Sequence, residues 1–475
     1  MPSGRCCLEG TQAAKAFPVK PSLVDPPSWR FPLVEPAEVP DSSTAEVQER
    51  PAGTPAARVL THPANHHFLW IIAAALVGLA LKCTIALNTL GTGDVLAFYK
   101  FGHTLTEHSL EWSYQHDKAL NHPPLVAYYV RLIYGADHVA VLRENGISFQ
   151  FLLRLPAIIA DLVVVLLLAR CRKQLSLPTW SLIVLALSPA SLMVSGFHGN
   201  TDPVMVMFLV LAAWMCLREA PLWCGVLLAL SCQIKIIPLL FTPIFVCFWF
   251  SRRKALPFIL TFTATLALLW IEPLLRCPVL FVKNVLLYGG FWGCWGITYW
   301  LRLTGIRDFN FVSYQGLPPA EEIVMAALKV FIIVCVLIIA WRRRDLKGNA
   351  IFKSLAYGWM VFFVFSPAVA PQYLIWLTPF VLVLSPSIAA YLIATSSMFL
   401  FVFYHVCSGG FPWNLAVSTR ALNEITTPWS LWPWAVLIAA LVFLWRSALR
   451  DQPGFRLLSL APLREEQGLC STVIE

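Results

Sequence analysis

The sequence predicts an all-α fold, a polytopic bundle of about twelve transmembrane helices. Of its 475 residues, 58% are hydrophobic and only 13% are charged, whereas soluble domains carry about 25% charged residues. The mean hydropathy is +0.68. The apolar residues are gathered in successive runs, many of them long enough to cross a hydrocarbon layer of about 30 Å. A chain of this composition must bury its apolar surface in lipid.

The apolar runs place the transmembrane domain within residues 66–450. We expect spans near residues 68–88, 149–170, 177–196, 203–217, 221–237, 238–251, 255–274, 320–341, 349–366, 372–386, 388–406 and 429–447. Around residues 237 and 238 the pattern fits either two interrupted helices or one re-entrant pair. Residues 1–65 are rich in proline, alanine, serine and charge and lack apolar periodicity, which predicts a disordered cytoplasmic tail rather than a signal peptide. Residues 451–475 are expected to form a second cytoplasmic tail.

Clusters of basic residues predict the orientation of the bundle. They lie at residues 170–173, 252–254, 342–347 and 446–450, all on one face of the predicted topology. The positive-inside rule makes that face cytoplasmic, together with both termini. The 35 lysines and arginines outnumber the 26 aspartates and glutamates, and we interpret this excess as an orientation signal rather than a nucleic-acid surface. The thirteen cysteines are scattered without a CxxC pair and are interpreted as apolar packing residues.

Two long loops, at about residues 89–148 and 275–319, then lie on the extracytoplasmic face. Both are rich in aromatic residues and glycine. Loops of this length are usually functional, and their composition fits helices lying at the headgroup boundary. Ordinary loop packing over the bundle is the alternative.

The first candidate for chemistry is Asp94, which follows Gly93 directly after the first span. A carboxylate at the membrane boundary of an external loop can act as a general base toward an acceptor hydroxyl, although an aspartate after a glycine is often a helix cap. Further along the same loop, Asn121 and His122 precede two prolines, which hold the chain in an extended turn.

Charged residues inside the second span form a further candidate. Arg154 and Asp161 are seven residues apart and therefore share a helix face. Charges at this depth are costly and usually pair with another helix or line a polar cavity. Either reading fits this pair.

Three more candidates lie at the expected external helix ends. His198, Asn200 and Asp202 form a compact polar turn in which Asp202 is expected to cap the next helix. Lys235 lies between two apolar stretches and can hold a phosphate as a point charge, or its amine can extend to the interface. Gln372 and Tyr373 open a span after a proline-rich turn, where they can contact a polar headgroup.

The order of these features resembles the GT-C superfamily of integral membrane glycosyltransferases, which use polyprenyl-phosphate-linked sugars. The matching segments are the Gly-Asp pair, the downstream His-Pro-Pro, "LRLPAIIADL", "FHGNTDP", "QIKIIPLLFTP", "YGGFWGCWGITYW" and "PQYLIWLTPF". The resemblance covers about residues 68–450 and is closest to the mannosyl- and glucosyltransferases of lipid-linked glycan assembly and their bacterial relatives. In those enzymes Tyr-Pro-Pro follows the Gly-Asp pair, and this chain has His122 in place of the tyrosine.

The resemblance implies an inverting transfer of mannose or glucose from a polyprenyl-phosphate donor to a lipid or glycan acceptor at the extracytoplasmic face. It makes Asp94 the catalytic base. The donor phosphate or substrate would be bound by other candidates, namely Arg154, His198, Lys235, Gln372, Tyr373, Asp202 and Asp161. Neither a metal ion nor a cofactor is expected, and the membrane lipids are the remaining partners. The likeness to bacterial members points to a plasma membrane, with the endoplasmic reticulum as the alternative.

Two other classes of protein stay open. A secondary transporter or lipid flippase also has broken helices and intramembrane charges, but it predicts an internal repeat that is not evident in the sequence. A structural subunit with the same fold and no activity is the third reading. No Walker A loop, GxGxxG fingerprint or HExxH motif is found in the sequence, so a donor already carried by the membrane suits the enzyme reading best.

Overall fold

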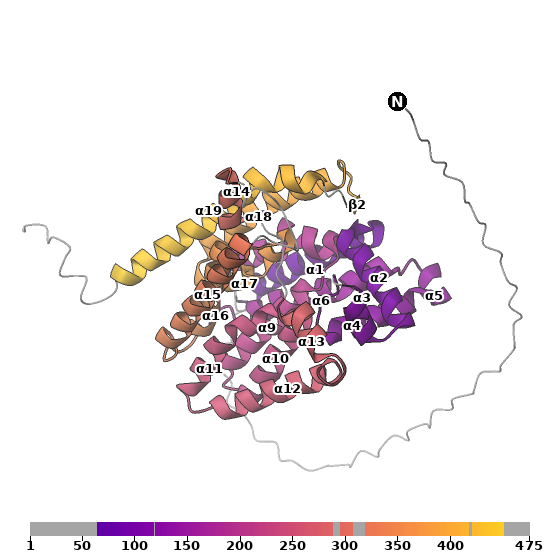
Figure 1. Cartoon of the computed structure of the whole chain (residues 1–475). Coiled ribbons are helices and arrows are strands. Elements are labelled where there is room, and N and C mark those ends of the chain that lie inside the picture. The colour runs from indigo at the N-terminus through magenta and orange to yellow at the C-terminus, as the bar shows by residue number, and fades with distance from the viewer. Residues whose placement is uncertain (1–63, 118, 288–294, 307–318, 418–419, 451–475) are drawn as a thin grey trace, which may run out of the picture. The chain divides into compact units, whose positions relative to one another are not determined.

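The computed structural model describes residues 64–117, 119–287, 295–306, 319–417 and 420–450 (Figure 1). Within these ranges the regular structure is helical apart from two strands of two residues each, which confirms the predicted all-α class. The predicted C-terminal tail, and all but the last two residues of the predicted N-terminal tail, lie outside the described residues.

Six of the described helical segments are long and apolar enough to cross a membrane. They are α1 (Ala64–Asn88), α6 (Phe149–Arg170), the stretch formed by α7 (Thr179–Ala186), α8 (Pro189–Ser191) and the π-helix η1 (Leu192–His198), and then α12 (Ala255–Arg276), α15 (Pro319–Arg342) and α18 (Pro386–Cys407). Each corresponds to one predicted span. For α6 the predicted and observed boundaries are identical, because the Ser148 hydroxyl caps its first turn by accepting from the Phe151 N–H.

The other six predicted spans are also helices, but shorter ones. They are α9 (Asp202–Leu217), α10 (Pro221–Ile234), η2 (Ile237–Phe241) with α11 (Thr242–Phe250), α16 (Ala350–Phe365), η5 (Pro371–Ile375) with α17 (Thr378–Leu384), and the apolar part of α19 (Arg420–Arg450). The count of twelve crossings therefore stays a prediction.

The helices are interrupted at three neighbouring places. Helix α10 ends at Ile234, and a short 3-10 helix leads through Pro238 into α11. A second 3-10 helix, η5, precedes α17, and it begins at Pro371. The third interruption is η1, which ends at Gly199 in a left-handed conformation with φ +82°. Proline removes a backbone donor and stops regular helix, and irregular backbone at membrane depth is tolerated where it is buried in protein or lines a cavity.

The first long loop folds into α2 (Gly93–Glu107), α3 (Leu110–His116), α4 (Pro124–Asp137) and α5 (Ala140–Glu144), the purple group in Figure 1. Helix α2 buries Val95, Phe98 and Phe101 on one face and packs against α4. Leu96 and Tyr99 on its other face are exposed. The loop thus contains amphipathic helices, and their place at the headgroup boundary stays a prediction.

The second long loop is described in part, as α13 (Pro278–Phe281), η3 (Val282–Leu286) and α14 (Gly296–Leu303). Asn284 in η3 donates to the carbonyl oxygen of Tyr114 in α3 at 2.6 Å. The two long loops are therefore in direct contact.

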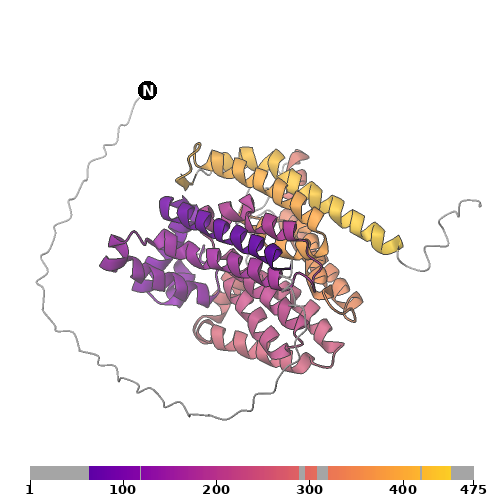
Figure 2. The ribbon, with the colours of Figure 1, turned by 180° about the vertical axis from the view of Figure 1, so that it is seen from behind.

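A feature that the sequence did not predict joins the start of α2 to the end of α18. Strand β1 (Gly91–Thr92) pairs in parallel with β2 (Leu415–Ala416). The backbone N–H groups of Leu90 and Gly91 both donate to the Asn414 carbonyl oxygen at 2.9 Å. Helices α18 and α19 lie side by side beyond this pair (Figure 2).

Candidate active site

Asp94 lies in the first turn of α2, and its carboxylate does not cap the helix. Thr92 is the N-cap, and its hydroxyl accepts from the Asp94 N–H at 3.3 Å. The Asp94 side chain is 44% exposed, so the carboxylate can be reached from outside. The structure therefore assigns the cap to Thr92 and leaves Asp94 available for chemistry.

Three nitrogen atoms from two distant segments surround one oxygen of this carboxylate. The Oδ2 atom of Asp94 lies 3.0 Å from Nε2 of His198 at the end of η1 and 3.5 Å from Nδ2 of Asn200. Nε2 of Gln372, in η5, also lies at 3.5 Å. Asp94, His198 and Gln372 were predicted from separate motifs, and the structure brings them together.

The His198 ring is held from its other side as well. Its Nδ1 atom lies 2.8 Å from the hydroxyl of Tyr404 in α18, and its backbone carbonyl accepts from the Thr92 hydroxyl at 2.8 Å. Because an ionised Asp94 can only accept, Nε2 of His198 is the donor between them. In the neutral ring Nδ1 then accepts the Tyr404 hydroxyl proton, so the tautomer and the orientation of His198 are both defined.

The electrostatic surroundings keep Asp94 ionised. Burial by itself raises the pKa of this carboxyl, but the charge and hydrogen bond of His198, followed by the charge of Lys235, lower the pKa below its ordinary value of 3.8. Asp94 is therefore an anion near neutral pH and is able to accept a proton.

Lys235 lies just beyond the last residue of α10, where the backbone is extended. Its Nζ atom pairs with Oδ1 of the fully buried Asp202 at 2.8 Å, and the indole N–H of Trp376 donates to the other oxygen at 2.9 Å. The amine also lies 4.2 Å from the ring centroid of Tyr373, within range of a cation–π interaction. Lys235 is thus held inside the protein by Asp202 and two aromatic rings and does not extend to the interface.

The expected role of Asp202 as a helix cap is wrong. Thr201 occupies the N-cap position of α9, and neither side chain caps the helix. The Asp202 carboxylate is used instead to hold Lys235 and Trp376. A buried lysine without such a partner would lose its charge, so this pair explains why Asp202 is found here.

Arg154 lies behind the site rather than in it. Its side chain is fully buried, and Nη1 donates to the carbonyl oxygens of Ala86 and Thr89 at 3.1 and 3.0 Å. Its guanidinium also lies against Gly91 and Gly199, on either side of the Asp94 site. Arg154 therefore supports the backbone that carries Asp94 and His198, and the structure does not place it where a ligand phosphate can reach it.

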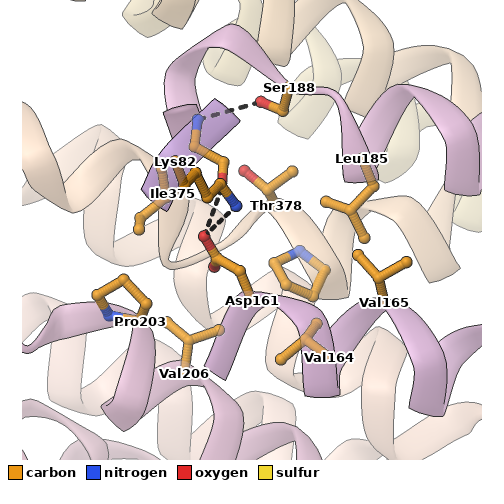
Figure 3. Close-up of a pocket in the computed structure, with 12 residues that line it drawn as sticks. Lys82, Asp161, Val164, Val165, Leu185, Ser188, Pro203, Val206, Ile375 and Thr378 are labelled. Atoms are coloured by element: carbon orange, nitrogen blue, oxygen red, sulfur yellow. Dashed lines mark hydrogen bonds and ion pairs between the residues drawn. The ribbon is translucent and has the colours of Figure 1, made fainter. Parts of the chain in front are cut away.

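Asp161 belongs to a different polar cluster. Its Oδ2 atom accepts from the Lys82 amine at 2.5 Å and from the hydroxyls of Ser191 and Ser195 at 2.6 Å each. Lys82 and Asp161 face each other at a cavity of about 30 Å³ (Figure 3), which has room for about two water molecules. Asp161 therefore pairs with a lysine of another helix, as one of the two alternatives proposed, and it also lines a small cavity whose wall is mostly apolar.

Several residues of the site were not evident from the sequence. Tyr404 and Trp376 are aromatic residues within apolar stretches, where nothing distinguishes a site residue from a packing residue. Lys82 is equally inconspicuous in the sequence, because a single lysine near the end of a span resembles an interfacial anchor. His122 lies in the His-Pro-Pro motif, which by itself gives no role to the side chain.

A comparison with known protein families gives a match over part of the chain. Residues 146–371 match the model of glycosyltransferase family 87. The match contains Arg154, His198 and Lys235, while Asp94 precedes it and Gln372 follows its last residue. A search of the curated proteins gave no match.

Six long apolar helices among the described residues, together with this match, indicate an integral membrane protein. The family match also indicates glycosyltransferase activity, and it agrees with the resemblance drawn from the sequence motifs. Residues 146–371 are thus similar to glycosyltransferase family 87, a GT-C-like family of membrane glycosyltransferases.

Proposed function

We propose that the protein transfers mannose or glucose from a polyprenyl-phosphate donor to a lipid or glycan acceptor at the extracytoplasmic face, with inversion at the anomeric carbon. The observation that carries the proposal is the Asp94 carboxylate, which is partly exposed, surrounded by His198, Asn200 and Gln372, and close enough to Lys235 for that charge to lower its pKa.

The chemistry is a single displacement. Asp94 takes the proton of the acceptor hydroxyl as the hydroxyl oxygen attacks the anomeric carbon. The bond from that carbon to the phosphate oxygen breaks on the opposite face, and the electron pair leaves with the polyprenyl phosphate. His198, bonded to both Asp94 and Tyr404, keeps the carboxylate oriented during this step.

The leaving phosphate needs stabilisation of its negative charge more than it needs an acid. Lys235 is the cation placed for this role, since one N–H is used by Asp202 and an ammonium group has three. The Tyr373 and Trp376 rings fix the amine in position. Lys235 and Tyr373 are therefore assigned to the donor phosphate in this proposal.

The test compares Asp94→Asn with wild type in detergent, using radiolabelled polyprenyl-phosphate mannose or glucose and membrane lipid extract as the source of acceptors. Loss of a positioned general base is expected to reduce transfer by about 10²–10⁴-fold. Asp345→Asn is the matched control, because it makes the same chemical change in an exposed side chain of the turn after α15.

Retained transfer by Asp94→Asn would overturn the assignment of the base. A wild type that binds either donor but transfers neither sugar would contradict the proposed donors and favour a transporter.

A further inference from the structure

His122 is held rigidly at the start of α4. Two prolines follow it, and they form the N-terminus of that helix. The Tyr114 hydroxyl donates to the His122 carbonyl oxygen at 2.7 Å. The imidazole packs against the Phe98 ring with centroids 5.0 Å apart. The backbone and one face of the ring are thus fixed, so the ring nitrogens have a defined direction.

One of these nitrogens has no partner. Nδ1 of His122 is buried and makes no hydrogen bond to any residue that the structure describes. Buried polar atoms are nearly always hydrogen-bonded, and an exception needs an explanation. An unpaired acceptor destabilises the folded protein, and a ligand that bonds to Nδ1 would remove that cost.

The contact of His122 with Phe98 places it near Asp94, because Asp94 and Phe98 are four residues apart and therefore neighbours on one face of α2. Burial and then the positive charge of Lys235 lower the pKa of this imidazole to about 3, against the opposing effect of Asp94. The ring is therefore neutral throughout the physiological range. A neutral imidazole can form a hydrogen bond with a hydroxyl group, but it has no positive charge with which to stabilise a phosphate. In the proposed function Lys235 supplies that charge.

We infer that Nδ1 of His122 binds a hydroxyl of the acceptor sugar, next to the hydroxyl that Asp94 deprotonates, and so determines which acceptor is used. The inference rests on the proposed function, because the acceptor is the substrate that must touch the base. His122 and Asp94 come from the same external loop, so one rigid segment presents both the base and its neighbouring recognition group.

The test is a comparison of His122→Leu with His122→Asn. Asparagine places a polar atom close to the position of Nδ1, whereas leucine fills similar space without one. Octyl mannoside or octyl glucoside serves as the acceptor, whichever the wild type uses. We expect His122→Leu to raise the acceptor KM about tenfold, consistent with the loss of one hydrogen bond, and His122→Asn to restore most of the affinity. The donor KM should be unchanged in both.

Acceptor analogues that each lack one hydroxyl make the test specific. For the hydroxyl that binds His122, the wild type and His122→Leu should have the same acceptor KM, while for other hydroxyls the tenfold difference should persist. His103→Leu, on the exposed side of α2, is the control and should leave the KM unchanged.

Three results would overturn the inference: a rise in the donor KM instead of the acceptor KM, equal damage by leucine and asparagine, or a tenfold difference that persists with every analogue. Full transfer by Asp94→Asn is a separate result, because it would refute the proposed base and not the contact of His122.

Discussion

At the scale of single residues, Gly199 decides whether His198 and Asn200 can reach Asp94. Its φ is +82°, and a Cβ atom there would lie 2.2 Å from Cγ2 of Val95. Both the conformation and the space exclude a larger residue. We expect Gly199→Ala to lower the free energy of unfolding by about 1–3 kcal/mol and to abolish transfer, as measured by thermal unfolding in detergent and by the activity assay.

Gly146 offers the matched comparison for this prediction. It also has positive φ, at +73°, but a Cβ atom there would meet nothing within 4 Å. Gly146→Ala is therefore expected to carry only the backbone cost and to stay active. Equal loss of activity in both variants would show that the close packing around Gly199 is unimportant.

The low pKa of Asp94 has a consequence for the pH dependence of the enzyme. A carboxyl whose pKa is lowered stays ionised as the pH falls and loses its base form only below its ordinary value of 3.8. The acidic limb of kcat/KM due to this group is expected below about pH 4 in the wild type. His198→Gln removes the largest lowering influence, so the limb should move to higher pH in a profile measured from about pH 3 to pH 8. An unshifted limb would contradict the electrostatic role of His198.

The residue types of the site were largely predictable, and their grouping was not. Charged and polar side chains are rare in apolar runs, and this rarity marks four residues of the site in the sequence, namely Asp94, His198, Lys235 and Gln372. The sequence does not show, however, which neighbouring elements a given helix face packs against. Arg154 and Asp161 share one face of α6 but have different surroundings. Arg154 supports the backbone near Asp94, and Asp161 binds Lys82 and two serines.

At the scale of elements, the pair of Lys82 and Asp161 fastens α1 and α6 to η1. Both side chains are largely buried, with 5% and 19% exposed. Removing one partner of a buried pair leaves an uncompensated charge, so Asp161→Leu is expected to cost about 3–5 kcal/mol of stability. The double variant Lys82→Met, Asp161→Leu should cost less than Asp161→Leu alone in thermal unfolding. A larger loss in the double variant would contradict this.

Helix boundaries were predictable to within a few residues, since caps, prolines and the apolar runs all mark them. The π-helix η1 and the 3-10 helices η2 and η5 were not. Such irregular turns leave the hydropathy pattern unchanged, because one residue more or fewer per turn does not alter which residues are apolar. They nevertheless position His198 and Gln372, so the least predictable elements carry much of the site.

At the scale of the whole molecule, the predicted orientation can be tested at two turns. Gly146 follows α5, and Gly348 lies between α15 and α16 beside the basic cluster. Both have positive φ and open space around a Cβ atom, so an inserted epitope tag should be tolerated at either. With about twelve spans, a tag after Gly146 is expected on the extracytoplasmic face and one after Gly348 in the cytoplasm. Antibody binding to intact and permeabilised cells measures this, and labelling of both tags from the same side would refute the topology.

The parallel pairing of β1 with β2 bears on how the protein is made. Gly91 and Thr92 precede Asp94, yet their partners Leu415 and Ala416 are more than three hundred residues further along the chain. Tyr404, which holds His198, is also a late residue. While the ribosome is still synthesising α18, the base therefore lacks part of its surroundings, so activity is acquired only when membrane insertion is nearly complete. A chain released before β2 is made would insert into the membrane but would have no transferase activity.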